Sequence, residues 1–263
     1  MCCNKVKIMD NKVTKKRIND HLEYDWYKYL IILVLGIVLF YFAFSQINRT
    51  RDYEDVNIFV SCYEADDNRF TDRVLEDMTR QNYENARYGE AVLREISFET
   101  QDPLGKEYST LFQTHGMVSS DVLILGKSLL ESMGAGFLVL TDEILNDYIL
   151  PGLTADGNPD GAALGINDLQ YHYVKREDGT ELRTGIKVIG FSNLPFKTDW
   201  RSVEQYKEQY SEVEENEQPD DEFYLVINTS SVNIGGFGKK AKKANRQTFY
   251  VVNRFIKYYR VRV

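Results

Sequence analysis

The chain has 263 residues, of which 27% are charged, and its formal net charge is −8 at pH 7. A nucleic-acid partner is not expected, because an acidic surface repels the phosphate backbone. The chain is not a disulfide-rich secreted scaffold either, since Cys62 is its only cysteine beyond residue 3.

The first predicted element is an apolar helix over residues 29–48, YLIILVLGIVLFYFAFSQIN, a run without a charged side chain. As a helix it would be about 30 Å long, the thickness of a bilayer's hydrocarbon core. A core helix of a soluble domain would show a polar face. A signal peptide would have a shorter apolar region and a better cleavage site than Ala43-Phe44-Ser45. We therefore expect a retained transmembrane helix.

Lysine and arginine are unevenly distributed around this run. Residues 1–28 carry seven of them, whereas residues 49–66 carry two. The positive-inside rule then predicts a single-pass cell-membrane protein with its N-terminus in the cytosol. Three segments result: a cytosolic basic N-terminus (1–28), a transmembrane helix (29–48) and an extracytoplasmic domain (49–263).

The segment 49–263 alternates between short apolar runs and helical patterns. Strands are predicted at 56–62, 91–99, 119–126, 135–140 and 223–228, and helices at 68–86, 102–116, 127–134, 141–149, 198–213 and 248–261. Residues 169–192 give two further strands around Asp178-Gly179, a hairpin signal. The expected fold class is α/β, with a mixed, partly parallel sheet and helices on both of its faces.

Two glycine-containing segments resemble phosphate-binding motifs but do not satisfy them. The sequence DVLILGKS (121–128) has Asp121 where a P-loop needs its first glycine. The sequence GFGKKA (236–241) fits a relaxed dinucleotide pattern, but no acidic residue follows Glu222 to bind a ribose. We expect no cofactor.

The sequence DGNPDG (156–161) places Asp156, Asn158 and Asp160 at the spacing that opens a calcium loop. The twelfth position is Asn167 instead of a bidentate Glu, and the same residue types form ordinary turns. We expect no metal site here.

Signals of catalysis are weak. The three histidines, His21, His115 and His172, are not clustered in the sequence, and no Cys/His metal spacing or serine-nucleophile motif occurs. We expect that the chain is not an enzyme.

The end of the chain is basic. Residues 239–263 carry nine basic and no acidic side chains, so residues 49–238 carry a net charge of −20. This basic end is either solvated charge that offsets the acidic remainder or a contact with an anionic surface such as lipid head groups.

Taken together, VNIFVSCYEADD, VLREISFE, SSDVLILGKSLLESM and GFLVLTDEILNDYI resemble the first lobe of an extracellular solute-binding protein of the ABC-importer type. GIKVIGFSNLPF resembles the strand that returns from the hinge, and FYLVINTSSVNIG with TFYVVNRFIKYY resembles the family's last strand and helix. The resemblance implies a reduced, membrane-anchored relative with a periplasmic-binding-protein-like fold that binds a small solute.

Ligands of open α/β sheets bind beyond the carboxyl ends of the strands. This rule selects as ligand-binding candidates Tyr63, Glu64, Asp66, Gly126, Lys127, Ser192, Asn193, Thr229 and Ser230. Two other functions stay open: an accessory subunit that docks on an envelope or transporter complex and binds no small molecule, and an enzyme, which would need convergent titratable groups in a pocket.

Overall fold

The computed structural model describes residues 14–49, 52, 54–65, 72, 76, 93–133, 136–155, 160–188, 191, 194–214, 217–234 and 246–260. The chain divides into two compact units, Met1–Arg49 and Thr50–Val263, and each is described by itself.

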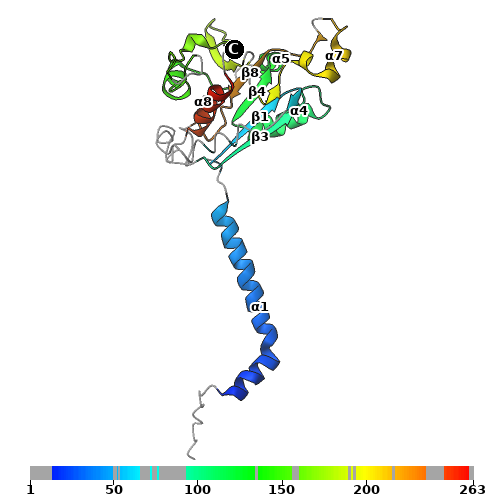
Figure 1. The fold of residues 1–263 in the computed structure, drawn as a ribbon, viewed down its shortest axis with the longest axis vertical. Coiled ribbons are helices and arrows are strands. Elements are labelled where there is room, and N and C mark those ends of the chain that lie inside the picture. Colours follow the sequence, from blue (N-terminus) through cyan, green and yellow to red (C-terminus); the bar gives the residue numbers. More distant parts are fainter. Residues whose placement is uncertain are drawn as a thin grey trace, which may run out of the picture. The chain divides into compact units, whose positions relative to one another are not determined.

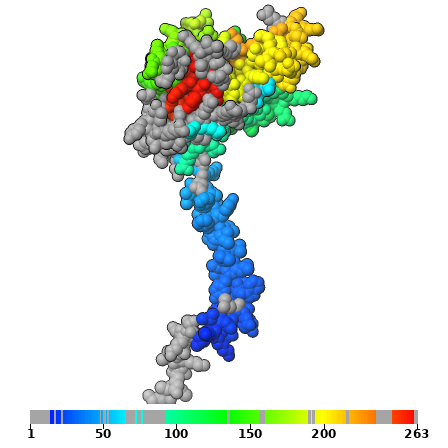
Figure 2. All heavy atoms as spheres, viewed as in Figure 1, coloured from blue at the N-terminus to red at the C-terminus, as the bar shows by residue number. Residues whose placement is uncertain are grey.

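The first unit contains the helix α1, Lys15–Asn48. Its segment Glu23–Ile47 is long and apolar enough to cross a membrane, and none of its most apolar stretch is buried (Figure 2). The predicted apolar helix is therefore present, but it begins at Lys15 because residues 15–28 contain no Gly or Pro to stop it. The carboxylate of Asp25 also contacts the side chains of His21 and Lys28, which lie one helical turn before and after it. Such contacts between neighbouring turns stabilise this polar part of the helix.

The second unit is built on a six-stranded sheet with the order β3-β1-β4-β8-β6-β5. Its strands are β1 (Asp55–Ser61), β3 (Glu95–Gln101), β4 (Val122–Gly126), β5 (Tyr171–Lys175), β6 (Glu181–Lys187) and β8 (Phe223–Ile227). Strand β1 is parallel to both β3 and β4, whereas β8 is antiparallel to β4 and β6, and β5 is antiparallel to β6. The expected mixed, partly parallel sheet is confirmed.

Both faces of the sheet are buried because successive side chains of each strand point to opposite faces. Ile58 and Val60 of β1 pack on one face with the C-terminal helix α8, Gln247–Tyr259. Phe59 packs on the other face with Phe112 and Leu130. In Figure 1 the strands β1, β3 and β4 stand between α8 on one side and α4 on the other. The helices expected on both faces are present.

The helices on the second face are short. They are α4 (Tyr108–Leu111), which continues as the π-helix η2 (Phe112–Met117), and α5 (Lys127–Met133). The predicted helix 102–116 therefore begins later, because the side chain of Asp102 accepts a hydrogen bond from the backbone N–H of Leu104 and holds a turn there.

The other predicted elements are partly confirmed. The helix 141–149 is present as α6 (Asp142–Ile144) followed by the π-helix η3 (Leu145–Ile149), and Thr141 caps it. The hairpin β5–β6 turns at Gly179, whose φ of +85° is readily adopted only by glycine.

Two expectations were wrong in extent. Residues 135–140 form no strand in their described part, where Phe137 makes a single bridge to Asn228. The helix 198–213 is split into the 3-10 turn η5 (Trp200–Ser202) and α7 (Glu204–Tyr210), since Asp199 caps the first turn. The helix expected at 68–86 lies almost entirely outside the described residues.

The described part of the unit also contains three small elements. Strands β2 (Glu64–Ala65) and β7 (Phe196–Lys197) form a separate antiparallel pair. The 3-10 helix η4 (Ile166–Asp168) lies in the loop before β5. Strand β7 follows β6 in the chain, so its pairing with β2 brings the segment after β1 against the chain that leaves β6.

Candidate functional site

The parallel part of the sheet contains a topological switch point. From β1 the chain passes to β3 on one side of it and then to β4 on the other. Crossovers that run in opposite directions leave a crevice at the carboxyl ends of the strands, where ligands of open α/β sheets bind. A ligand site is therefore expected among the residues that follow β1 and β4.

A pocket of about 470 Å³ lies at this position. Its walls come from the ends of β1 and β4, the segment after β3, the first turns of α4 and α5, the end of α7, the segment before β8, and the first residue of β8. The lining residues are Ser61, Tyr63, Pro103, Leu104, Tyr108, Gly126, Ser128, Leu129, Tyr210, Glu217, Gln218, Pro219, Asp220 and Phe223. Its volume and largely aromatic and aliphatic walls are typical of a small-molecule site.

The carboxylate of Asp220 lies over the end of β4. Its Oδ2 accepts hydrogen bonds from the hydroxyl of Ser128 and from the backbone N–H of Ser128 at 3.0 Å. A Cβ placed on Gly126 would lie 2.6 Å from this Oδ2. The absence of a side chain at Gly126 is therefore what allows Asp220 to reach the pocket wall.

Tyr63 connects the end of β1 to the same segment. Its hydroxyl donates to the backbone carbonyl of Asp220 at 2.8 Å, and its ring contacts the edges of Tyr206 and Phe223. Burial, and then the nearby charge of Asp220, raise the pKa of the Tyr63 hydroxyl, so it stays a protonated donor.

Tyr108 forms the facing wall. Its hydroxyl donates to Ser61 Oγ at 3.0 Å, and its ring stacks on Phe112. Burial raises its pKa to about 12, so this hydroxyl is also neutral near pH 7. The pocket thus has aromatic walls whose polar ends are hydrogen-bonded within the protein.

The cations next to the pocket are paired outside it. Two lysines form ion pairs with Glu222: Lys187 at 2.5 Å and Lys127 at 3.3 Å. The hydrogen bond from Lys187 is the main cause that lowers the pKa of Glu222 to about 2, and Lys127 adds to it. Arg201 pairs with Asp221. Among the described residues no Lys, Arg or His lines the pocket, whereas Glu217 and Asp220 do.

The predicted binding residues are brought together only in part. Tyr63 and Gly126 line the pocket. Lys127 and Glu64 lie at the same end of the sheet but are engaged in ion pairs with Glu222 and Lys197. Asp66, Ser192 and Asn193 lie outside the described residues, as do Asp156 and Asn158 of the predicted calcium-like loop.

Thr229 and Ser230 lie at the opposite end of the sheet, so grouping them with the others was wrong in geometry. Strand β8 is antiparallel to β4, and its carboxyl end therefore meets the amino end of β4. There the Thr229 hydroxyl donates to the carbonyl of Gly136, and Ser230 donates to the side chain of Asn228. Both residues stabilise a turn in this arrangement.

Sequence reasoning missed the acidic segment that forms a wall. The segment 214–222, EENEQPDDE, has the composition of an acidic surface loop, yet Glu217 to Asp220 line the pocket. The one available signal was Gly126 at the end of a buried strand, which marks a place where another segment approaches closely. Nothing in the local pattern identifies Asp220 as the segment that does so.

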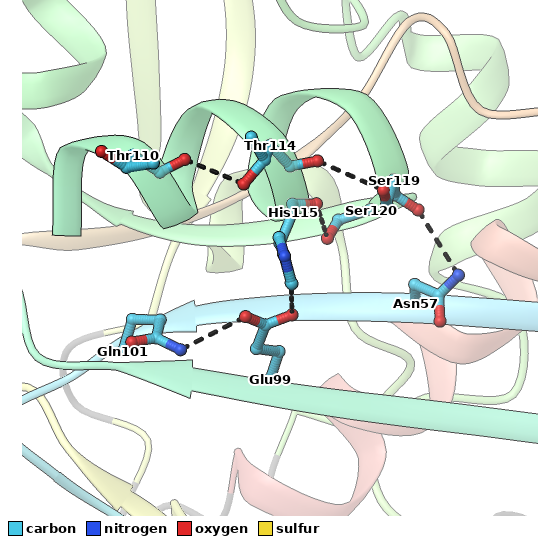
Figure 3. Close-up of polar contacts among 8 residues, drawn as sticks. All are labelled: Asn57, Glu99, Gln101, Thr110, Thr114, His115, Ser119 and Ser120. Atoms are coloured by element: carbon cyan, nitrogen blue, oxygen red, sulfur yellow. Dashed lines mark hydrogen bonds and ion pairs between the residues drawn. The ribbon is translucent and has the colours of Figure 1, made fainter. Parts of the chain in front are cut away.

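A second group of polar side chains lies on β3 and η2, and Figure 3 shows the ring of His115 directed at Glu99. His115 Nδ1 lies 2.7 Å from Glu99 Oε2, and Gln101 donates to the other oxygen of Glu99. The hydroxyls of Thr114 and Ser120 donate to backbone carbonyls of the helix and are not directed at the imidazole. None of the residues drawn in Figure 3 therefore supplies the nucleophile that would complete a catalytic triad with His115 and Glu99.

Other catalytic chemistry finds little support in the described part of the chain. No group of three or more His, Cys, Asp or Glu side chains there is arranged to hold a metal ion. Cys62 is buried, and burial raises the pKa of its thiol to about 12, so it is not a thiolate nucleophile near neutral pH.

Comparisons with protein-family models, with curated proteins and with solved structures found no match to this chain.

Proposed function

We propose that this chain is a single-pass membrane protein whose α/β unit binds a small molecule in the pocket at the carboxyl ends of β1 and β4. The pocket itself is the observation that carries the proposal. It combines a switch point, a volume of about 470 Å³, and walls from segments that are distant in the sequence.

The resemblance to a reduced extracellular solute-binding protein is part of this proposal. It is supported by the parallel strands β3-β1-β4 and by the pair β2–β7, which joins the segment after β1 to the segment after β6. Among the described residues this pair is the only sheet besides the six-stranded one, so a full second lobe is not part of the proposed function.

The proposed orientation, with residues 49–263 outside the cell, follows from the distribution of Lys and Arg around the apolar helix. Protease added to intact cells should digest the α/β unit and spare an epitope fused to the N-terminus. Protection of the α/β unit would overturn this orientation.

Small-molecule binding is tested by a thermal-shift screen of small solutes on the full chain in lipid nanodiscs. Leu129 is half-buried in the pocket wall, so Leu129→Trp should fill the pocket. Ser132→Trp adds the same ring to an exposed position of the same helix and serves as the matched control.

We expect solutes that raise the melting temperature of the wild type and of Ser132→Trp but not that of Leu129→Trp. A screen in which every stabilising solute acts equally on both variants would contradict the proposal. It would favour the alternative of an accessory subunit that binds no small molecule.

A further inference from the structure

The described residues that line the pocket have an imbalance of charge: Glu217 and Asp220 are carboxylates, and no Lys, Arg or His lies among them. Tyr63, Tyr108, Ser128 and Gln218 each donate to a protein acceptor, whereas the hydroxyls of Ser61 and Tyr210 accept hydrogen bonds, from Tyr108 and Gln209. The backbone N–H of Ser128 is also used, by Asp220. Four of the six uncharged polar side chains in the walls thus already donate within the protein, and the hydroxyls of Ser61 and Tyr210 can donate to a ligand.

Acceptors remain available. Asp220 is bonded through Oδ2 only, which leaves the lone pairs of Oδ1. Glu217 is exposed, and its carboxylate takes part in no ion pair within the described part of the chain. The described walls thus offer two carboxylates and no cation, which suits a ligand that supplies positive charge.

The walls add a second, independent preference. Tyr108 and Tyr210 line the pocket with half-buried side chains, and a cation is attracted to the face of such a ring. The apolar side chains Leu104 and Leu129 suit the hydrocarbon part of a ligand. An inorganic cation alone would leave this apolar surface unused.

We propose that the ligand of this pocket is an organic amine: a protonated nitrogen held by Asp220 and Glu217, attached to an apolar body that packs on the tyrosines. This assignment rests on the proposed small-molecule function and names its chemical class. Anionic solutes are excluded from the pocket by the two carboxylates and by the pairing of Lys127, Lys187 and Arg201 with acidic residues outside it.

The test uses three probes of similar size and shape: 2-phenylethylamine, 2-phenylethanol and phenylacetate, which are positive, neutral and negative. Binding is measured by titration calorimetry on the full chain in nanodiscs of zwitterionic lipid, with empty nanodiscs as the blank. We expect the amine to bind about tenfold more tightly than the alcohol, the size expected of an exposed ion pair with a cation–π contact, and phenylacetate to bind weakest.

The charge is then removed one residue at a time. Glu217→Gln and Asp220→Asn should each reduce the preference for the amine by about threefold, as expected of one partly exposed charge. Glu208→Gln removes the same charge from an exposed position of α7 that does not line the pocket, and it should change nothing. Glu217→Gln keeps the test valid if Asp220→Asn disturbs the fold, because Glu217 is exposed.

The outcomes separate this inference from the proposed function. Equal affinity for all three probes, lost in Leu129→Trp, would overturn the amine assignment and leave small-molecule binding in place. Amine binding that persists in Leu129→Trp, or that is absent while other solutes bind in the pocket, would also overturn the assignment.

Discussion

The six-stranded sheet has a carboxylate at each end of its parallel strands β1 and β4, and the two carboxylates have different surroundings. At the carboxyl end, Asp220 is half-buried, bonded on one oxygen, and faces a pocket. At the amino end, Asp121 is 6% exposed, and both of its oxygens are bonded: Asn57 N–H donates at 2.9 Å and Ser231 Oγ at 2.5 Å.

The amino end is a connected polar network. Asn233 donates to the carbonyls of Asp52 and Asp55 at 3.0 and 2.6 Å, and Asn228 donates to the carbonyl of Ser120 at 3.0 Å. These bonds connect the start of β1, the start of β4 and the segment after β8. The comparison indicates that buried polar groups at the amino end hold the fold, whereas those at the carboxyl end are arranged around open space.

The largest expected difference is in stability. Asp121→Ala should lower the free energy of unfolding by about 3 kcal/mol, because it leaves buried donors of Asn57 and Ser231 without an acceptor. Asp220→Ala should cost about 1 kcal/mol, since its position is partly open to water. Urea unfolding of the full chain in neutral detergent measures both values. Equal losses in the free energy of unfolding would contradict the difference between the two carboxylates.

A pH dependence should follow from the same difference. Burial, which outweighs the hydrogen bonds from Ser231 and Asn57, raises the pKa of Asp121 from its ordinary 3.8 to about 6. Between these values the folded chain retains a proton that the unfolded chain has released. The free energy of unfolding should therefore fall as pH rises from about 4 to 6, by about 2 kcal/mol from this group.

The control for this effect is Asp121→Asn, which keeps the shape of the side chain and cannot titrate. The difference in stability between the wild type and this variant should change with pH only in the window from about 4 to 6. A difference that stays constant across this window would contradict the assignment to Asp121.

The close approach of Asp220 to β4 is tested by Gly126→Ala. The new Cβ would lie 2.6 Å from Asp220 Oδ2, so the segment must move, and we expect a loss of about 1 to 2 kcal/mol together with the loss of ligand binding. Gly136→Ala is the matched control, because its Cβ would meet Met117 only at 4.0 Å. Equal effects of the two substitutions on binding would show that the position of Asp220 is unimportant.

The last prediction concerns membrane binding instead of stability, and it involves the basic segment, whose residues Lys239, Lys240, Lys242 and Lys243 lie outside the described residues. Asn233 precedes this segment and is bonded to Asp52, which follows the end of α1 closely in the sequence. Replacing the four lysines by Gln should weaken binding of residues 50–263 to anionic vesicles, by up to about 1 kcal/mol for each lysine at the surface. Equal binding of both proteins at low salt would leave these lysines as solvated charge.

The sequence predicted those parts of the fold that depend on local pattern. Runs such as VNIFVS and DVLILG are short and apolar on both faces, which identifies buried strands and an α/β sheet. The direction of β8 is not encoded in its own apolar pattern, and this is why Thr229 and Ser230 were grouped with residues at the wrong end of the sheet.

The pocket was predictable only through the strand-end rule. That rule found Tyr63 and Gly126, because the ends of parallel strands meet at one edge of the sheet. It could not find Tyr108, Tyr210 or Asp220, which come from segments whose approach depends on tertiary packing. A run of charged residues such as 214–222 is usually solvated, and only the missing side chain at Gly126, which lets Asp220 approach β4, makes this one part of a site.

The central claim is that the pocket at the carboxyl ends of β1 and β4 holds a small molecule. Native mass spectrometry of the full chain, released directly from its own membrane, tests this claim without a prior choice of ligand. We predict a bound small mass on the wild type and on Ser132→Trp that is absent from Leu129→Trp. A wild type without any bound mass, or the same bound mass on Leu129→Trp, would contradict the account.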